Sequence, residues 1–269
     1  MFNSGDRMHV YDEDIQLRLN GGGRIQATVS DRWSVNETPD GGYLMALLGC
    51  AALEASKKSG LSILTANFID RTQPGPAEIV AEHMGASRHF DRWQVSLFQE
   101  EVEKIRSLVT LSDGTPDGTD ARYEKTVPAL APPGDCVQFG QMPGYTLFDN
   151  MDVLLDPACA GWTTGKLGDR SELRGWIKFK DDRTFDAPAL LLVADAFPPP
   201  VFATQGMVAW VPTLEMSVNI RNRPRTRWLK CVFRTRFLNG GMVEEDGEIW
   251  DEAGELVAIS RQVAQYRKT

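Results

Sequence analysis

The chain has 269 residues, of which 42% are hydrophobic and 25% charged, with a formal net charge of −8. This composition is typical of a soluble globular protein with one large or two ordinary domains. The negative charge argues against nucleic acid or an anionic membrane surface as the main partner.

The cysteines and histidines also exclude some chemistry. The three histidines are dispersed, and the cysteines lie far apart, so neither a metal site nor a disulfide framework is expected. The N-terminus lacks the apolar core of a signal peptide, and no run approaches the about 20 apolar residues of a spanning helix. We therefore expect a cytoplasmic protein without a membrane partner. The cysteines are Cys50, Cys136, Cys159 and Cys231.

The first half begins with two short alternating stretches, Ile15–Leu19 and Ile25–Val29, which predict strands with one buried face. A turn-like segment over 36–42 precedes an apolar run rich in Ala, Leu and Met, from Tyr43 to Lys58. Strong helix formers, terminal lysines and the following Gly60 predict one buried helix. Four further strands are expected at Ser62–Arg71, Ala77–Arg88, Trp93–Glu101 and Lys104–Ser112.

From Gly114 to Met142 the composition shifts to Gly, Pro, Asp and Thr, which indicates a linker. We place an N-terminal module at 1–115, the linker at 116–142 and a C-terminal module at 143–269.

The second half repeats the order of elements. Strands are expected at Ala160–Lys166 and Leu173–Phe179, followed by an apolar helix that ends by Phe197. Asp186 is a plausible N-cap with Pro188 in the first turn, and the three prolines 198–200 cannot continue the helix. Four more strands are expected at Trp210–Arg221, Trp228–Leu238, Met242–Trp250 and Leu256–Tyr266.

Each half therefore has strands, one apolar helix and four strands. A helix that is apolar on most faces needs cover on most faces, and a curved antiparallel sheet wrapped around it supplies that cover. This is the hot-dog arrangement. The predicted fold class is α+β, a double hot-dog in which two modules of one chain imitate a dimer.

Three segments of the second half carry a family resemblance. Leu191–Pro198 has an Asp before an aromatic residue and a Pro, Val211–Ser217 has a Thr a few residues before a Ser, and Leu256–Gln262 ends on a Gln. Together with the Asp40-Gly41-Gly42 helix start, these segments resemble the acyl-CoA thioesterase II family of double hot-dog proteins.

The resemblance implies hydrolysis of an acyl-CoA thioester, with Asp195, Thr213 and Gln262 as catalytic residues. It implies no cofactor, since coenzyme A belongs to the substrate, and a role in fatty acid metabolism. We also expect a homodimer or higher homo-oligomer. Two departures concern the family's Asp-His pair, replaced by Glu215 and Met216, and its Gln after the Gly pair, which is Tyr43.

Thioester hydrolysis needs an activated water, a base and donors to the developing oxyanion. Asp195 is expected near the C-terminal end of a helix, where the helix dipole favours its protonated form. Thr213 and Gln262 can hold a water against it. We expect the oxyanion and substrate site at Gly41, Gly42 and Tyr43, since glycine lets a ligand approach backbone N–H groups.

Simpler interpretations remain open for each residue. Asp195 could cap the turn before Pro198, Thr213 could be an ordinary strand residue and Gln262 a solvated one. The glycine pair could serve only as a turn. The arginine-rich segment 221–227 could be a solvated loop or could meet the phosphates of coenzyme A.

Two other functions also remain open. One is a hot-dog hydratase or dehydratase. The other is a module that binds an acyl group or acyl-CoA without turnover.

Overall fold

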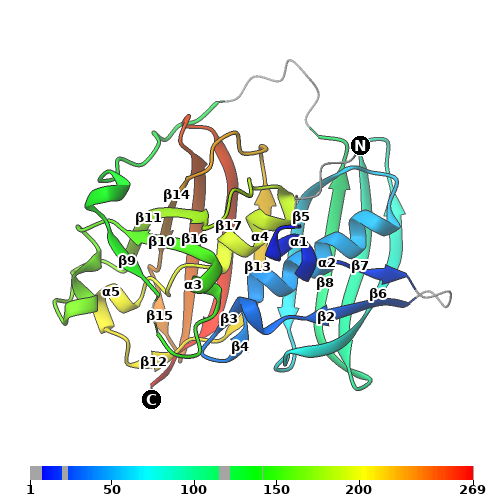
Figure 1. Cartoon of the computed structure of the whole chain (residues 1–269), viewed down its shortest axis with the longest axis horizontal. Coiled ribbons are helices and arrows are strands. Elements are labelled where there is room, and N and C mark those ends of the chain that lie inside the picture. Colours follow the sequence, from blue (N-terminus) through cyan, green and yellow to red (C-terminus); the bar gives the residue numbers. More distant parts are fainter. Residues whose placement is uncertain (1–7, 20–23, 115–121, 141, 269) are drawn as a thin grey trace, which may run out of the picture.

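The computed structural model describes residues 8–19, 24–114, 122–140 and 142–268 (Figure 1). Two modules lie side by side, each with one long apolar helix against a curved antiparallel sheet. The predicted α+β double hot-dog is confirmed.

The first module surrounds helix α2. Its elements are α1 (Val10–Asp14), β1 (Arg18–Leu19), β2 (Arg24–Val29), the 3-10 helix η1 (Asp31–Trp33), β3 (Ser34–Val35), β4 (Thr38–Pro39), α2 (Gly41–Ala55), β5 (Gly60–Phe68), β6 (Gly75–Ala86), β7 (Phe90–Gln99) and β8 (Val102–Ser112).

The second module surrounds helix α4. Its elements are η2 (Pro133–Asp135), β9 (Val137–Phe139), α3 (Leu147–Asn150), β10 (Met151–Leu155), η3 (Ala160–Thr164), β11 (Glu172–Phe179), α4 (Ala187–Asp195), α5 (Phe202–Gln205), β12 (Ala209–Trp210), β13 (Thr213–Ile220), β14 (Leu229–Arg234), β15 (Leu238–Asn239), β16 (Met242–Asp251), β17 (Leu256–Gln265) and β18 (Arg267–Lys268).

One continuous sheet joins the modules, in the order β1-β2-β6-β7-β8-β5-β13-β17-β16-β14-β11-β10-β9. The strand after each long helix lies at the junction, where β5 and β13 pair antiparallel with Ala66 opposite Met216. The Thr65 and Ser217 hydroxyls share a hydrogen bond of 2.8 Å across this pair. The order of strands outward from the junction is thus nearly the same in both modules.

The two long helices are buried because their sequences have no polar stripe. In α2 the side chains from Tyr43 to Leu48 are at most 3% exposed. Each helix begins with an aspartate cap: Asp40 accepts from the Tyr43 N–H at 3.0 Å, and Asp186 accepts from the Ala189 N–H at 2.9 Å. The predicted cap at Asp186 is confirmed.

Helices α2 and α4 pack antiparallel, which brings the start of α2 to the end of α4. A Cβ added at Gly42 would lie 2.4 Å from the Leu191 carbonyl oxygen and 3.0 Å from the Asp195 Cβ. Only glycine allows this approach, because any side chain would push the helix backbones apart.

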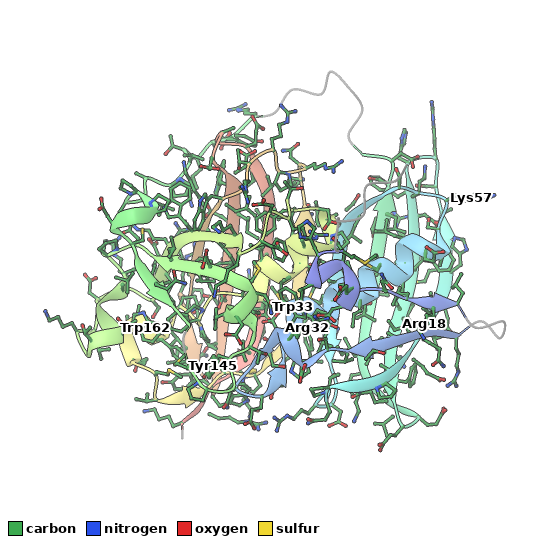
Figure 2. All side chains as sticks on the ribbon, viewed as in Figure 1. Arg18, Arg32, Trp33, Lys57, Tyr145 and Trp162 are labelled. Atoms are coloured by element: carbon green, nitrogen blue, oxygen red, sulfur yellow. The ribbon has the colours of Figure 1, made fainter. Side chains whose placement is uncertain are left out.

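An aromatic cluster closes the seam between the modules on another side. Trp33 stacks on Tyr43 with ring centroids 6.2 Å apart and meets the edge of Phe179, from β11, at 6.1 Å. Tyr11 of α1 contacts the same Trp33 and Phe179 rings. Figure 2 shows Trp33 near the middle of the molecule, where residues from both modules pack together.

Some predicted elements differ from the structure. The expected strand Ala160–Lys166 is the 3-10 helix η3, which ends at Gly165 with a φ of 79°. The strand β10 was missed, because four of its five residues are buried and the stretch does not alternate. Of the expected strand Ile15–Leu19 only Arg18 and Leu19 are extended, and helix α1 precedes them.

Part of the predicted linker 116–142 is structured. Within it, β9 adds an edge strand to the sheet of the second module, pairing with β10. Residues 115–121 and 141 lie outside the described residues. Among the helices of the described residues, none has the length and apolar character needed to cross a membrane.

Candidate functional site

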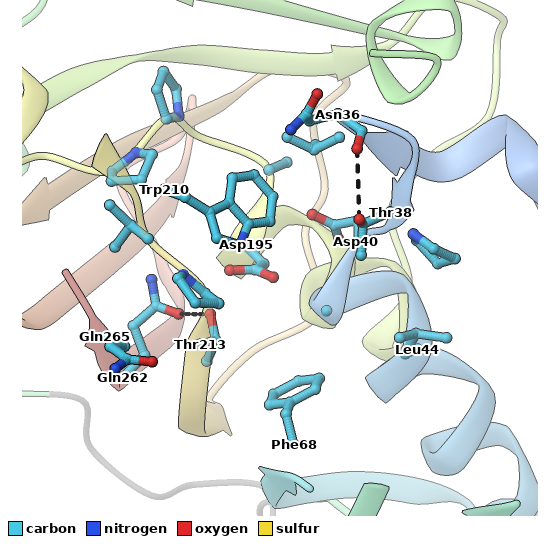
Figure 3. A pocket seen from close by; sticks show the side chains of 18 of the residues that line it. Asn36, Thr38, Asp40, Leu44, Phe68, Asp195, Trp210, Thr213, Gln262 and Gln265 are labelled. Carbon is cyan, nitrogen blue, oxygen red and sulfur yellow. Dashed lines mark hydrogen bonds between the residues drawn. The ribbon is translucent and has the colours of Figure 1, made fainter. Parts of the chain in front are cut away.

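A cavity of about 790 Å³ opens where the start of α2 meets the end of α4. Both modules line it, and the three predicted catalytic residues Asp195, Thr213 and Gln262 lie together in its wall (Figure 3). Its lining includes seven aromatic residues, which are Phe68, Phe139, Tyr145, Phe148, Phe197, Phe202 and Trp210.

Asp195 is the last residue of α4, and its carboxylate faces the first turn of α2. The Gly42 N–H donates to Asp195 Oδ2 at 3.1 Å. Burial raises the pKa of Asp195 to about 6, while the backbone hydrogen bonds from Gly42 and Gly41 oppose the rise. The expected direction of the shift is confirmed, with burial as its largest cause.

A second acid, Asp40, lies beside this carboxylate and was not among the predicted site residues. It lines the cavity, is only 5% exposed and caps α2 through the Tyr43 N–H. Burial first, and then the charge of Asp195, raise the pKa of Asp40 well above its usual range. The helix start therefore holds two carboxyl groups that disfavour simultaneous ionisation.

Thr213 and Gln262 form a hydrogen-bonded pair on neighbouring strands. The Thr213 hydroxyl donates to Gln262 Oε1 at 3.0 Å (Figure 3). Thr213 begins β13, next to an irregularity in its pairing with β17, and Gln262 is on β17. Because its hydrogen is directed to Gln262, the Thr213 oxygen is left with lone pairs that can accept a hydrogen bond.

A buried glutamate supports this pair from behind. Glu245 of β16 lies opposite Gln262 in the ladder, and the two side chains are hydrogen-bonded. Glu245 is 8% exposed, and burial raises its pKa well above the usual range. The sequence does contain a signal for Glu245, because the alternation of residues in β16 places this acid at an inward-facing position of the strand.

The three residues predicted to bind the oxyanion and the substrate do not all lie in the cavity wall. Gly41 lines the cavity, but the N–H groups of Gly41 and Gly42 are both already engaged by Asp195. Tyr43 does not line the cavity. Its ring is fully buried against Trp33, and its hydroxyl accepts from the Ser30 N–H at 3.0 Å, so it is a core residue.

The departures from the family pattern leave the cavity unchanged. Glu215 is exposed and Met216 is buried, and neither belongs to the cavity lining, unlike Thr213 and Leu214. None of the arginines in the segment 221–227 lines the cavity either, and Arg227 pairs with Asp182.

The lining offers carboxylates, a hydroxyl and amides. It contains no histidine or cysteine among the described residues, and the described part of the chain has no group of three His, Cys, Asp or Glu side chains arranged to hold a metal. The arrangement can hold a water molecule against a carboxylate of raised pKa, beside an apolar chamber.

Several solved structures share the fold. A Thermobifida fusca YX protein assigned to thioesterase II aligns with a TM-score of 0.89 at 24% identity, covering 97% of this chain and 98% of that one. A hot-dog protein of Alicyclobacillus acidocaldarius aligns with a TM-score of 0.88 at 20% identity, covering 98% and 100%. The acyl-CoA thioesterase II TesB2 of Mycobacterium marinum aligns with a TM-score of 0.77 at 17% identity, covering 97% and 99%.

Family models identify both modules. The model of the acyl-CoA thioesterase N-terminal domain matches residues 29–112, and that of the C-terminal domain matches residues 127–266. These matches span most of the chain, including Asp195, Thr213 and Gln262. The chain therefore belongs to the acyl-CoA thioesterase family.

Proposed function

We propose that the protein hydrolyses an acyl-CoA thioester to a carboxylic acid and free coenzyme A, with Asp195 as the general base. The observation that carries the proposal is the position of Asp195. Its carboxylate, with a pKa of about 6, lines an apolar cavity beside the Thr213–Gln262 pair. A pKa just below neutral keeps the carboxylate ionised at pH 7 and still able to accept a proton.

The hydrogen bonds leave a place for one water. Asp195 accepts from the N–H groups of Gly42 and Gly41, and its two carboxylate oxygens have further lone pairs that can accept a water hydrogen. The Thr213 oxygen accepts the other hydrogen, because its own hydrogen is donated to Gln262. A water held in this way directs its lone pair toward a carbonyl carbon in the cavity.

The reaction proceeds by addition and elimination. The water oxygen bonds to the thioester carbonyl carbon while its proton passes to Asp195. The tetrahedral intermediate collapses, the C–S bond breaks and Asp195 returns the proton to the leaving sulfur. As Asp195 becomes neutral, the positive end of the α2 dipole is released to stabilise the oxyanion.

The aromatic lining favours an apolar acyl group. Phe68 comes from the first module, and Phe148, Phe197 and Trp210 come from the second. Burying an acyl chain here releases about 0.8 kcal/mol per methylene group.

The test measures thiol release from acyl-CoAs of increasing chain length. We expect saturable turnover by the wild type, and a fall in kcat of about 10²- to 10⁴-fold for Asp195→Asn, which keeps the shape and loses the base. A matched control is Asp152→Asn, a carboxylate of β10 that pairs with Lys178 outside the cavity.

Other outcomes would identify the alternatives. Saturable binding without thiol release would make the protein a binding module. Hydration of an enoyl-CoA with no thiol release would make it a hydratase. Equal turnover by wild type and Asp195→Asn would remove Asp195 from the mechanism.

A further inference from the structure

Two arginines lie at the rim of the cavity, one from each module. Arg71 follows β5, and Arg267 is on the C-terminal strand β18. Among the described residues that line the cavity they are the only basic ones, and both are exposed. They therefore place positive charge where the cavity meets solvent, on a chain whose net charge is −8.

Neither guanidinium is neutralised. Arg71 donates to the Thr38 hydroxyl at 2.7 Å, and Arg267 donates to the Gln265 amide oxygen at 2.6 Å. The nearest acid in sequence, Asp70, also lines the cavity, but it pairs with Lys104. Within the part of the chain that the structure describes, neither arginine forms an ion pair with a carboxylate, although most other arginines do.

The two contacts orient the arginines without using their charge. A hydroxyl and an amide oxygen each engage one edge of a guanidinium and leave its other N–H groups for a ligand. Guanidinium groups bind phosphate oxygens through paired hydrogen bonds, so two free arginines at one rim favour a ligand with more than one phosphate.

We propose that Arg71 and Arg267 bind the phosphates of coenzyme A and hold the nucleotide at the rim while the pantetheine arm and acyl group extend to Asp195. This rests on the proposed thioesterase function and names the part of the substrate that each module recognises. The arginine-rich segment 221–227 does not serve this role, because it contributes no residue to the cavity lining.

The experiment compares an acyl-CoA with the same acyl group on pantetheine, which lacks the phosphates. For the double variant Arg71→Gln/Arg267→Gln we expect kcat/KM for acyl-CoA to fall about 10- to 100-fold, mostly through KM, because a hydrogen bond to a charged group contributes about 1.5–3 kcal/mol. The value for acyl-pantetheine should change less than about threefold. High salt should weaken the wild type's preference for acyl-CoA, since exposed charges are screened.

The matched control is Arg221→Gln/Arg223→Gln, which removes the same charge from the exposed arginine-rich segment outside the cavity. It should leave both substrates unaffected. An equal loss for acyl-CoA and acyl-pantetheine in the rim variant, or a loss in the control variant alone, would overturn the proposal.

A binding measurement separates this proposal from the proposed function. Titration with free coenzyme A should give a weaker Kd for the rim variant and an unchanged Kd for the control, whether or not the wild type releases thiol. If the wild type binds coenzyme A through these arginines but hydrolyses nothing, the phosphate rim stands and the thioesterase proposal fails.

Discussion

At the scale of single residues, Asp195 experiences opposing influences. Removal from solvent raises its pKa, and the N–H groups of the first turn of α2 lower it, with a net value of about 6. A carboxylate on the free surface would be a weaker base, and one buried without donors would stay protonated at neutral pH. The N–H groups at the start of α2 thus allow this buried carboxyl group to be ionised at neutral pH.

This pKa predicts the pH dependence of turnover. Because the base must be ionised, kcat/KM, which reports the pKa of the free enzyme, should rise with pH through about 6 and then level off, as measured by thiol release from pH 4.5 to 8.5. The residual rate of Asp195→Asn should show no such rise. A wild-type profile that is flat between pH 5 and 7 would contradict the assignment.

The same pKa predicts how Asp195 affects stability. Its pKa in the folded protein lies above the ordinary value of 3.8, so its stabilising contribution is complete below pH 4 and is lost as pH rises through 6. Asp195→Asn should therefore be more stable than wild type at pH 8, by on the order of 3 kcal/mol. Urea denaturation at pH 8 and pH 4 measures this, and the difference should shrink at the lower pH.

The hydrogen bond between Glu245 and Gln262 predicts that Glu245 acts as a positioning residue in the proposed reaction. Glu245→Leu should lower kcat by about 10- to 100-fold with KM nearly unchanged, because Gln262 and Thr213 lose their fixed orientation. Glu245→Gln, which can still accept a hydrogen bond, should restore most of the rate.

A double variant tests whether Glu245 and Thr213 belong to one chain of contacts. Thr213→Val/Glu245→Leu should cost little more than Thr213→Val alone. Additive losses in kcat would show that Glu245 acts by another route.

At the scale of elements, the packing of α2 against α4 positions the base. Gly42→Ala should destabilise the protein by about 1–3 kcal/mol and lower kcat, because the new Cβ meets the Leu191 carbonyl at 2.4 Å and separates the helices. Gly49→Ala on the same helix is the matched control. The atoms nearest to its Cβ would be side-chain methyl groups, of Leu191 at 3.2 Å, Leu61 at 3.3 Å and Leu64 at 3.7 Å, and alanine favours helix by about 1 kcal/mol.

The two variants separate the close contact from helix propensity. Chemical denaturation and thiol release should both show a larger loss for Gly42→Ala. Similar behaviour of the two variants in both measurements would mean that the close approach at Gly42 does not position Asp195.

The sequence predicted both long helices and most long strands, because their signals are local. Asp186 capped its helix as expected, and runs without polar residues became buried. The strand β10 was missed, because a strand buried on both faces has no alternation to detect. The segment of η3 was predicted as a strand but forms a 3-10 helix.

The site was predictable only in part. Asp195, Thr213 and Gln262 were identified through family order, and the structure brings them to one cavity. Asp40 and Glu245 were missed because their roles depend on a partner more than 15 residues away: Asp195 for one and Gln262 for the other. Sequence spacing contains no information about such pairings.

At the scale of the whole molecule, the two ends of the helix pair differ although the modules share one plan. At the end of the helix pair that lies away from the cavity, the second residue of α4 is Pro188, which has no N–H to donate. The second residue of α2, at the cavity, is Gly42, whose N–H donates to Asp195. The Asp186 charge acts at the end away from the cavity on Tyr11 and on Cys50, and burial raises the pKa of the Cys50 thiol to about 12. A protonated thiol is neither a base nor a nucleophile at neutral pH.

This opposite end is also occupied by protein. Arg183 is 8% exposed, donates to Asp12 of α1 and to Asp186, and lies 4.7 Å over the Tyr11 ring. A hollow of about 330 Å³ is lined, among the residues that the structure describes, by Ile15, Leu17, Leu19, Cys50 and Glu54, none of which has a hydroxyl or amide side chain. The chain therefore has the proposed catalytic residues at one end of the helix pair and, at the other end, contacts that hold α1 in place.

This asymmetry predicts one substrate site per chain and a structural role for Arg183. A non-hydrolysable thioether analogue of acyl-CoA should bind with a stoichiometry of one per chain by calorimetry. Arg183→Met should destabilise the fold by about 1.5–3 kcal/mol, because the half-exposed carboxylates of Asp12 and Asp186 lose their charged hydrogen-bond donor, while the folded fraction keeps the wild-type kcat. Arg227→Met, which breaks an exposed pair, should cost at most about 1 kcal/mol. Two bound analogues per chain, or loss of turnover in folded Arg183→Met, would place a second functional site at the end that α1 covers.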